Sequence, residues 1–381
     1  MMGYQGILNH NTHPFHRDTR IDVFRSLALL TIFINHIPGT LYETITHRNF
    51  GFSDSAEVFV LLSGVSLGLS FHARLYQQPF RVIVRKLWHR AFQLYGAYLF
   101  TTFVTLSLFL AGFLLWRTEK LLSMNNVGLF VTQPLVAFLS TLSFGHQLGY
   151  NNILPLYIVL MLFAPFALYW GCKRKGLLLL GSFMLYLLCG FYEIAPPSYP
   201  LKGKWFLNPL SWQLLFVIGL VSTLSLKQGK KIAFQPFWFV LSTAYLLLSL
   251  LWVRFNWWGV LGWLQWSSPL LDFNKTFLSL PRLLHVVALA MFILCLPRLH
   301  KWLHVSPHHP LAILGKHSLP VFVTGTVFAM FGQILKTVMT GTVFSDSLLI
   351  MSGIAMQLGV AYYYEKRQLF CRLSSRKPIR L

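Results

Sequence analysis

Residues 20–36 read RIDVFRSLALLTIFINH, and residues 50–64 read FGFSDSAEVFVLLSG. Each stretch has charged or polar residues in its first half and continues into an apolar run. The first run extends to residue 42, which supplies the roughly 20 residues that a helix needs to cross a bilayer. Because lipid offers the backbone no hydrogen-bonding partners, long apolar runs of this kind cross membranes as helices. These stretches therefore predict an all-α membrane fold.

Similar apolar runs recur along the rest of the chain. Hydrophobic residues make up 55% of the 381 residues and charged residues only 11%, a composition outside the range of soluble domains. The sequence predicts an all-α polytopic membrane protein with about ten transmembrane helices. The predicted spans lie near 22–42, 54–72, 91–115, 151–170, 177–194, 209–226, 233–253, 279–297, 317–337 and 345–364.

The segment 121–145 is also apolar, but it contains Asn125 and Pro134 and could be an eleventh span. Charge decides between the two topologies. With ten spans and an inside N-terminus, 22 Lys and Arg residues fall in inside segments and seven in outside segments. An eleventh span would place the basic loops CKRKG (172–176) and KQGKK (227–231) outside, against the positive-inside rule. The segment is therefore predicted to be a re-entrant or interfacial helix on the outer side.

This topology predicts a multi-pass protein of the bacterial inner membrane with both termini in the cytoplasm. A cytoplasmic tail (1–21) precedes a membrane domain (22–364), and a basic cytoplasmic tail (365–381) follows it. The net charge of +22 lies in short loops, where contact with lipid headgroups explains it better than nucleic-acid binding. The four cysteines show neither metal-binding nor redox spacing, so we expect no metal site and no disulfide.

Arg25 and His36 are ionisable residues inside the first predicted span, where such residues default to functional hypotheses. Eleven helical positions bring them within about 20° of one face, roughly 16 Å apart along the axis. Asp22 lies one turn before Arg25 and can pair with it. This face suits a long donor with an anionic head, such as an acyl-CoA, with His36 as general base. Alternatively, Arg25 snorkels to the interface and His36 bonds a neighbouring helix.

Asp54 and Glu57 open the second predicted span at about the depth of His36. A carboxylate beside an imidazole can fix its tautomer and stabilise the imidazolium. Glu57 is the better candidate because it lies one turn deeper. In the alternative reading, Asp54 is a helix N-cap and Glu57 an interfacial residue.

Three further groups are weaker candidates. Arg85 and Arg90, in the basic segment 73–90, could clamp the phosphates of a donor, although positive-inside bias explains the same charges. Arg282 and His285 lie one turn apart near the outer end of a span and could line an acceptor cavity or serve helix packing. The Trp-rich stretch at 252–266 could stack on sugar rings or form an aromatic belt.

Taken together, the two opening stretches resemble the start of the OpgC family, succinyltransferases of osmoregulated periplasmic glucans within the acyltransferase-3 superfamily. The similarity continues through ILPLYIVLMLFAPF (153–166), NPLSWQLLFVIG (208–219), NKTFLSLPRLLHVVALA (274–290) and LGKHSLPVF (314–322).

The resemblance implies an Arg-x10-His pattern, met here by Arg25 and His36, with the histidine at the catalytic centre. Glu57 matches the acidic position before the Ser-Gly of the second helix. The resemblance also implies an acyl-CoA co-substrate, with succinyl-CoA expected, on the cytoplasmic side. The implied acceptor is a hydroxyl of a periplasmic glucan or other carbohydrate. The superfamily's Arg-x-x-Arg motif before the third helix has no match here.

The sequence thus predicts a membrane O-acyltransferase with no permanently bound cofactor. Its expected partners are the acyl-CoA donor, the carbohydrate acceptor and membrane lipids. The main alternative is a transporter or flippase of an acylated or glycan substrate, for which intramembrane polar residues are also expected. The concentration of buried charges on the first two spans favours the enzyme.

Overall fold

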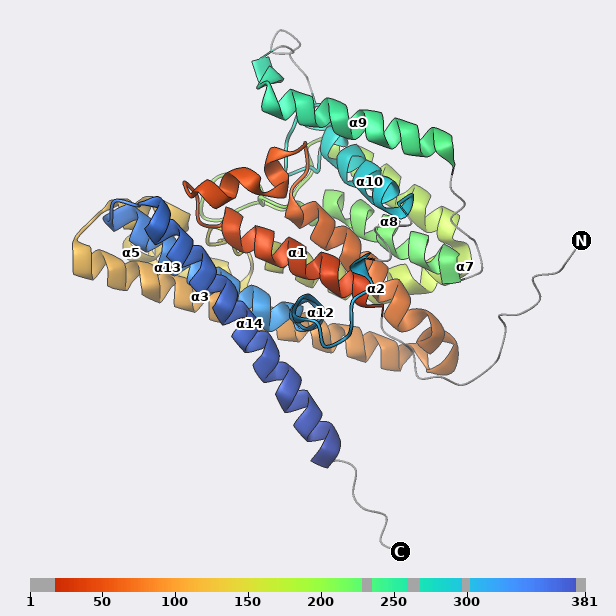
Figure 1. Ribbon diagram of the computed structural model, residues 1–381, viewed down its shortest axis with the longest axis horizontal. Helices are drawn as coiled ribbons and strands as arrows, with labels where there is room; N and C mark the ends of the chain where they lie inside the picture. The colour runs from red at the N-terminus through yellow and green to blue at the C-terminus, as the bar shows by residue number, and fades with distance from the viewer. Residues whose placement is uncertain (1–17, 228–234, 260–267, 297–301, 375–381) are drawn as a thin grey trace, which may run out of the picture.

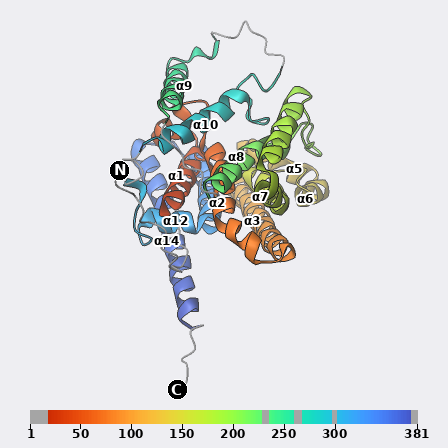
Figure 2. The same ribbon diagram turned by 90° about the vertical axis from the view of Figure 1, so that its right-hand side faces the viewer.

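A computed structural model of the chain describes residues 18–227, 235–259, 268–296 and 302–374. Within these ranges the chain forms helices joined by short loops, with no β-strand (Figures 1 and 2). The predicted all-α class is confirmed. The principal helices are α1 (Thr19–Asn35), α2 (Ser55–Gln77), α3 (Phe80–Trp116), α7 (Ile153–Phe191), α8 (Pro209–Lys227), α9 (Pro236–Arg254), α10 (Leu280–Leu294), α12 (Pro310–Lys316), α13 (Ser318–Val338) and α14 (Val343–Ser374).

Seven of these helices are long and apolar enough to cross a membrane, namely α2, α3, α7, α8, α9, α13 and α14. Helix α10, with 15 residues, is apolar but shorter, and α1 has 17 residues. The long apolar helices fit a multi-pass membrane protein, as the composition predicts. The number of about ten spans stays a prediction.

Helix α1 is shorter than the predicted span 22–42, which is wrong at its C-terminal end. The helix stops at Asn35, and His36 is its C-cap residue. Pro38 has no backbone N–H to continue the helical hydrogen bonds, and Gly39 adopts a φ of +80° that favours glycine. The imidazole of His36 is therefore at the end of the helix rather than deep within it.

Helix α7 contains a reversal between two predicted spans. Arg174 has non-helical backbone angles, with φ −142° and ψ 63°. The two ends of α7 come together beside residues 206–208. At the first end, Ile153 lines the same cavity as Leu207. Just after the second, the carbonyl oxygen of Ile194 accepts a 2.8 Å hydrogen bond from Asn208. Because both ends lie together, α7 doubles back at Arg174 as two antiparallel arms.

The segment 121–145 is broken into short helices, of which the longest has nine residues. It leaves and returns on one side of the fold, because Gly149 N donates to Asn125 O at 3.1 Å and Asn126 Nδ2 donates to Gln147 O at 3.1 Å. This arrangement agrees with a re-entrant or interfacial segment. Its elements are α4 (Lys120–Ser123), η3 (Met124–Asn126), α5 (Gly128–Thr132) and α6 (Pro134–Leu142).

Two segments predicted to lie outside the spans are largely helical. The basic segment 73–90 belongs to the end of α2 and the start of α3, separated by a turn at Gln78 and Pro79. A proline disfavours helical angles in the residue before it, which explains the break. At the other end of the chain, α14 continues to Ser374 and runs past the rest of the bundle (Figure 1). The tails 1–17 and 375–381 lie outside the described residues.

Helix α2 is at the centre of the bundle, with α9 and α10 on one side and α5 and α6 on the other (Figure 2). It packs closely against α8, because a Cβ atom at Gly64 would collide with the carbonyl oxygen of Phe216, and one at Gly219 with that of Leu61. Small residues allow backbones in membrane bundles to approach in this way. The contact holds the start of α2, which carries Asp54 and Glu57, in a fixed place.

Candidate active site

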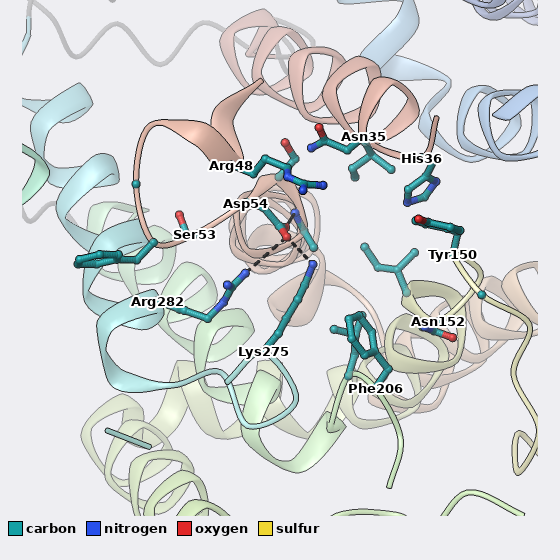
Figure 3. Close-up of a pocket in the computed structure, with 18 of the residues that line it drawn as sticks. Asn35, His36, Arg48, Ser53, Asp54, Tyr150, Asn152, Phe206, Lys275 and Arg282 are labelled. Carbon is teal, nitrogen blue, oxygen red and sulfur yellow. Dashed lines mark hydrogen bonds and ion pairs between the residues drawn. The ribbon is translucent and has the colours of Figure 1, made fainter. Parts of the chain in front are cut away.

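A cavity of about 590 Å³ opens where α1 ends and α2 begins (Figure 3). Both polar and aromatic side chains form its wall. They come from the end of α1, the loop before α2, the start of α7 with its preceding loop, the loop before α8, the short helix η4 (Trp257–Gly259), and the start of α10 with its preceding loop. The lining includes Asn35, His36, Arg48, Ser53, Asp54, Tyr150, Asn152, Phe206, Trp258, Lys275 and Arg282.

His36 lies on one side of the cavity, beside Tyr150 (Figure 3). The two ring centroids are 4.4 Å apart, and the imidazole Nδ1 has no hydrogen-bond partner among the described residues. The backbone carbonyl of His36 accepts a 2.6 Å hydrogen bond from Gln333 Nε2. The Gln333 Oε1 in turn accepts a 2.8 Å bond from Asn125 Nδ2. The fold thus anchors the backbone of His36, whose ring lines the cavity while its Nδ1 atom is buried.

Asp54, Lys275 and Arg282 lie on the opposite side of the cavity (Figure 3), and with the buried Glu57 they form a cluster of two carboxylates and two cations. Lys275 Nζ forms an ion pair with Asp54 Oδ2, and Arg282 Nη2 lies 3.4 Å from the same oxygen. Arg282 also binds Glu57 Oε1 through Nη2 at 2.5 Å and Nε at 2.7 Å. The side chain of Glu57 is fully buried. A carboxylate so buried is stable only when paired in this way.

Asp54 and Glu57 also form a capping box at the start of α2. Asp54 Oδ1 accepts from Ala56 N at 2.8 Å, and Asp54 N donates to Glu57 Oε2 at 3.0 Å. The N-cap reading of Asp54 is therefore confirmed, and the ion pairs add to it. Because capping fixes both carboxylates relative to α2, they in turn fix the directions of Lys275 and Arg282.

The expected partnership between Glu57 and His36 is wrong. Both oxygens of Glu57 are engaged, one by Arg282 and the other by the backbone of Asp54. The sequence suggested similar depth for His36 and Glu57 but could not show that Arg282, 225 residues away, would reach the carboxylate first. Lys275 was missed as a site residue because it looked like an ordinary loop cation.

The two acceptor-side candidates on α10 behave differently. Arg282 lines the cavity. His285 is buried behind its wall, where its Nδ1 shares a 2.7 Å hydrogen bond with Ser53 Oγ. Its ring also packs so closely under Gly51 that a Cβ atom there would collide with it. His285 therefore supports the loop before α2, as the packing alternative holds.

The donor-side candidates lie away from this cavity. Arg25 Nη1 and Asp22 Oδ1 are 3.7 Å apart, so their predicted pairing is confirmed. They lie on the part of α1 remote from His36, against α12, where Gly315 packs on the backbone of Asp22. Arg85 is exposed on α3, and Arg90 is half-buried beside a separate groove. Their roles in donor binding stay predictions.

Arg48 adds a third cation to the cavity, and its Nη1 lies 3.0 Å from Glu43 Oε1. Trp258, from the Trp-rich stretch, and Phe206 provide apolar wall, whereas Trp263 and Trp266 lie outside the described residues. The cavity thus combines three cationic side chains with an imidazole whose Nδ1 has no hydrogen-bond partner among the described residues. This set can take a proton from a hydroxyl and bind an anionic group near it.

A family model described as OpgC protein matches residues 17–369, which include every candidate site residue named above. No curated protein and no solved structure matches the chain.

Proposed function

The chain belongs to the OpgC family, and on that basis we propose that it is a membrane O-acyltransferase of glucan succinylation. In this proposal it transfers succinyl from cytoplasmic succinyl-CoA to hydroxyls of periplasmic glucans. The single observation that carries the proposal is the His36 imidazole, which lines a polar cavity with its Nδ1 unpartnered among the described residues.

In the proposed reaction a glucan hydroxyl oxygen attacks the thioester carbonyl carbon. His36 accepts the hydroxyl proton as the carbon–oxygen bond forms. The carbon–sulfur bond then breaks, and the CoA thiolate leaves and takes up the proton. The products are a glucan succinyl ester and CoA. A positioned base of this kind typically contributes about 10²- to 10⁴-fold to the rate.

The cations of the cavity support an acyl group that carries its own negative charge. Lys275 and Arg282 pair with the buried carboxylates of Asp54 and Glu57. Arg48 also has a carboxylate partner, Glu43, but its side chain is 49% exposed and its guanidinium extends over the cavity (Figure 3). A guanidinium can form two parallel hydrogen bonds with a carboxylate. We therefore assign the free carboxylate of the succinyl group to Arg48.

The proposed location is the bacterial inner membrane, with both termini in the cytoplasm. The positive-inside distribution of Lys and Arg supports this orientation. It places the Arg25 end of the bundle at the cytoplasm and the cavity at the periplasmic side, where a glucan could reach His36.

The test compares wild-type protein with His36→Gln, each reconstituted in nanodiscs with succinyl-CoA and a neutral periplasmic glucan. Mass spectrometry of the glucan measures ester formation directly. We expect wild-type protein to add succinyl groups and His36→Gln, at equal protein levels, to lose at least about a hundredfold of the rate. Near-wild-type transfer by the variant would reduce His36 to a packing residue. Absence of ester from wild-type protein would favour the transporter alternative.

A further inference from the structure

A second and larger hollow lies at the other end of the bundle from His36. It is a groove of about 890 Å³ between α3, α13 and α14, with Lys316 of α12 at its edge. We name it the donor groove. Its lining includes Arg90, Gln93, Lys316, His317, Ser318, Leu319, Tyr363 and Tyr364. Because Gly315, beside Lys316, packs on Asp22, the groove belongs to the Arg25 end.

A narrow hollow of about 20 Å³ lies between the donor groove and the His36 cavity. This narrow hollow shares Arg90, Ser318 and Leu319 with the donor groove and Ile153 with the cavity. Apolar side chains from α2, α3, α7 and α13 surround it, namely Phe59, Leu94, Leu154, Tyr157 and Phe322. The three hollows therefore form one series from one end of the bundle to the other.

Arg90 is the cation at the junction between the groove and the narrow hollow. Its Nη1 donates a 3.2 Å hydrogen bond to Gln93 Oε1, and no carboxylate among the described residues lies within ion-pair distance of it. Its guanidinium therefore keeps an unneutralised positive charge. Lys86 lies four residues earlier on the same stripe of α3 and adds a second positive charge to the approach.

The far wall of the groove is ordered by Glu365, which binds Lys316 Nζ at 2.6 Å and His317 Nε2 at 2.8 Å. Two tyrosines precede it on α14, and the side chain of Tyr363 is 61% exposed. An exposed aromatic face beside a cation suits a nucleobase that is joined to phosphates.

From these observations we infer that the donor groove binds the nucleotide head of the CoA thioester and that its pantetheine arm reaches His36 through the narrow hollow. The inference rests on the proposed function and gives its donor a site. A hollow of about 20 Å³ has room for about one water molecule. The arm therefore enters by displacing Leu319 and Phe322, while the nucleotide, which is too large, stays in the groove.

Binding of coenzyme A to the purified protein in nanodiscs tests the head site. Arg90→Gln should weaken binding by about tenfold to a hundredfold, because it removes a charge-assisted contact with phosphate. Arg81→Gln is the matched control, since Arg81 lies nine residues before Arg90 and thus on the opposite face of α3. We expect this control to bind within about twofold of wild type. Equal affinity in the two variants would overturn the inference.

Succinyl transfer tests the narrow hollow. At a saturating donor concentration, Leu319→Trp should lower the transfer rate at least about tenfold, because bulk at this position closes the path. Phe331→Trp, on an exposed part of the same helix, is the control and should transfer at the wild-type rate. If Leu319→Trp transfers as fast as this control, the arm takes another path and the inference is wrong.

Chemical modification of a variant that has already folded excludes misfolding as the reason for a loss of transfer. Ser318→Cys can be purified first and then treated with a bulky thiol reagent, with treated wild-type protein as the control for the native cysteines. We expect modification to stop transfer and coenzyme A to slow the modification. Failure of both effects would overturn the inference. Arg90-dependent binding of coenzyme A without glucan ester formation would instead refute the proposed function and leave the donor groove in place.

Discussion

Replacing Glu57 with Gln should destabilise the protein strongly, even though the side chains are nearly identical in size. Glu57 is fully buried, accepts two short hydrogen bonds from Arg282 and caps the backbone of Asp54. Removing one charge of a buried pair leaves the other uncompensated and typically costs about 3–5 kcal/mol. Asp54 still lies 3.4 Å from Arg282, and the Gln oxygen still accepts a bond. We therefore expect Glu57→Gln to lower the free energy of unfolding by about 3 kcal/mol, at the lower end of this range.

A double-mutant cycle isolates the pair. Its corners are the wild type, Glu57→Gln, Arg282→Met and the double variant, and the measured quantity is the free energy of unfolding in mixed micelles. The double variant removes both charges of the pair. Its loss of unfolding free energy should therefore be smaller than the sum of the two single-variant losses, by at least about 2 kcal/mol. The acyl-transfer rate of Glu57→Gln should fall less than that of His36→Gln, since Glu57 does not contact the imidazole. If Glu57→Gln lowered the free energy of unfolding by less than about 1 kcal/mol, as is usual for exposed ion pairs, this reasoning would be refuted.

Three further predictions follow from the same geometry. Gln333→Leu removes the hydrogen bond to the His36 carbonyl, so in steady-state kinetics kcat should fall severalfold with the donor KM unchanged. Gln333→Glu keeps an acceptor but also loses the donor amide, so it should show the same fall in kcat. Arg48→Gln should lower the preference for succinyl-CoA over acetyl-CoA by about tenfold or more in competition assays, because one charge-assisted contact is lost. Reporter fusions after residue 172 should report cytoplasm and fusions near residue 200 periplasm, and the reverse result would overturn the proposed topology.

Long apolar runs with charged or helix-breaking ends could be placed closely from the sequence. The predicted span 317–337 compares with Ser318–Val338, and 209–226 with Pro209–Lys227. Such runs need no tertiary information, because transfer into lipid and the length of a helix define them. The predicted span 22–42 failed where a local break overrode composition, since Pro38 and Gly39 end the helix although the chain stays apolar.

The candidate site was predicted as a set of residue types but not as a set of contacts. Arg25 and Asp22 are three residues apart, so helical geometry alone was enough to predict their pair. The partner of Glu57 comes from α10, and its identity depends on how α2 and α10 pack. Lys275 lies in a loop whose course no periodicity describes, so its ion pair with Asp54 could not be foreseen.

The narrow hollow also has an electrical consequence. A water-filled passage through the whole bundle would conduct ions, driven by about 2.3 kcal/mol for each elementary charge per 100 mV of membrane potential. Phe59, Leu94 and Phe322 place apolar groups around its narrowest part, where a hydrated ion would lose its water without compensation. Phe322, which the acyl arm would displace on the proposed path, is thus also part of the apolar barrier to ions. On that path, each turnover would need a donor that fills the gap it opens.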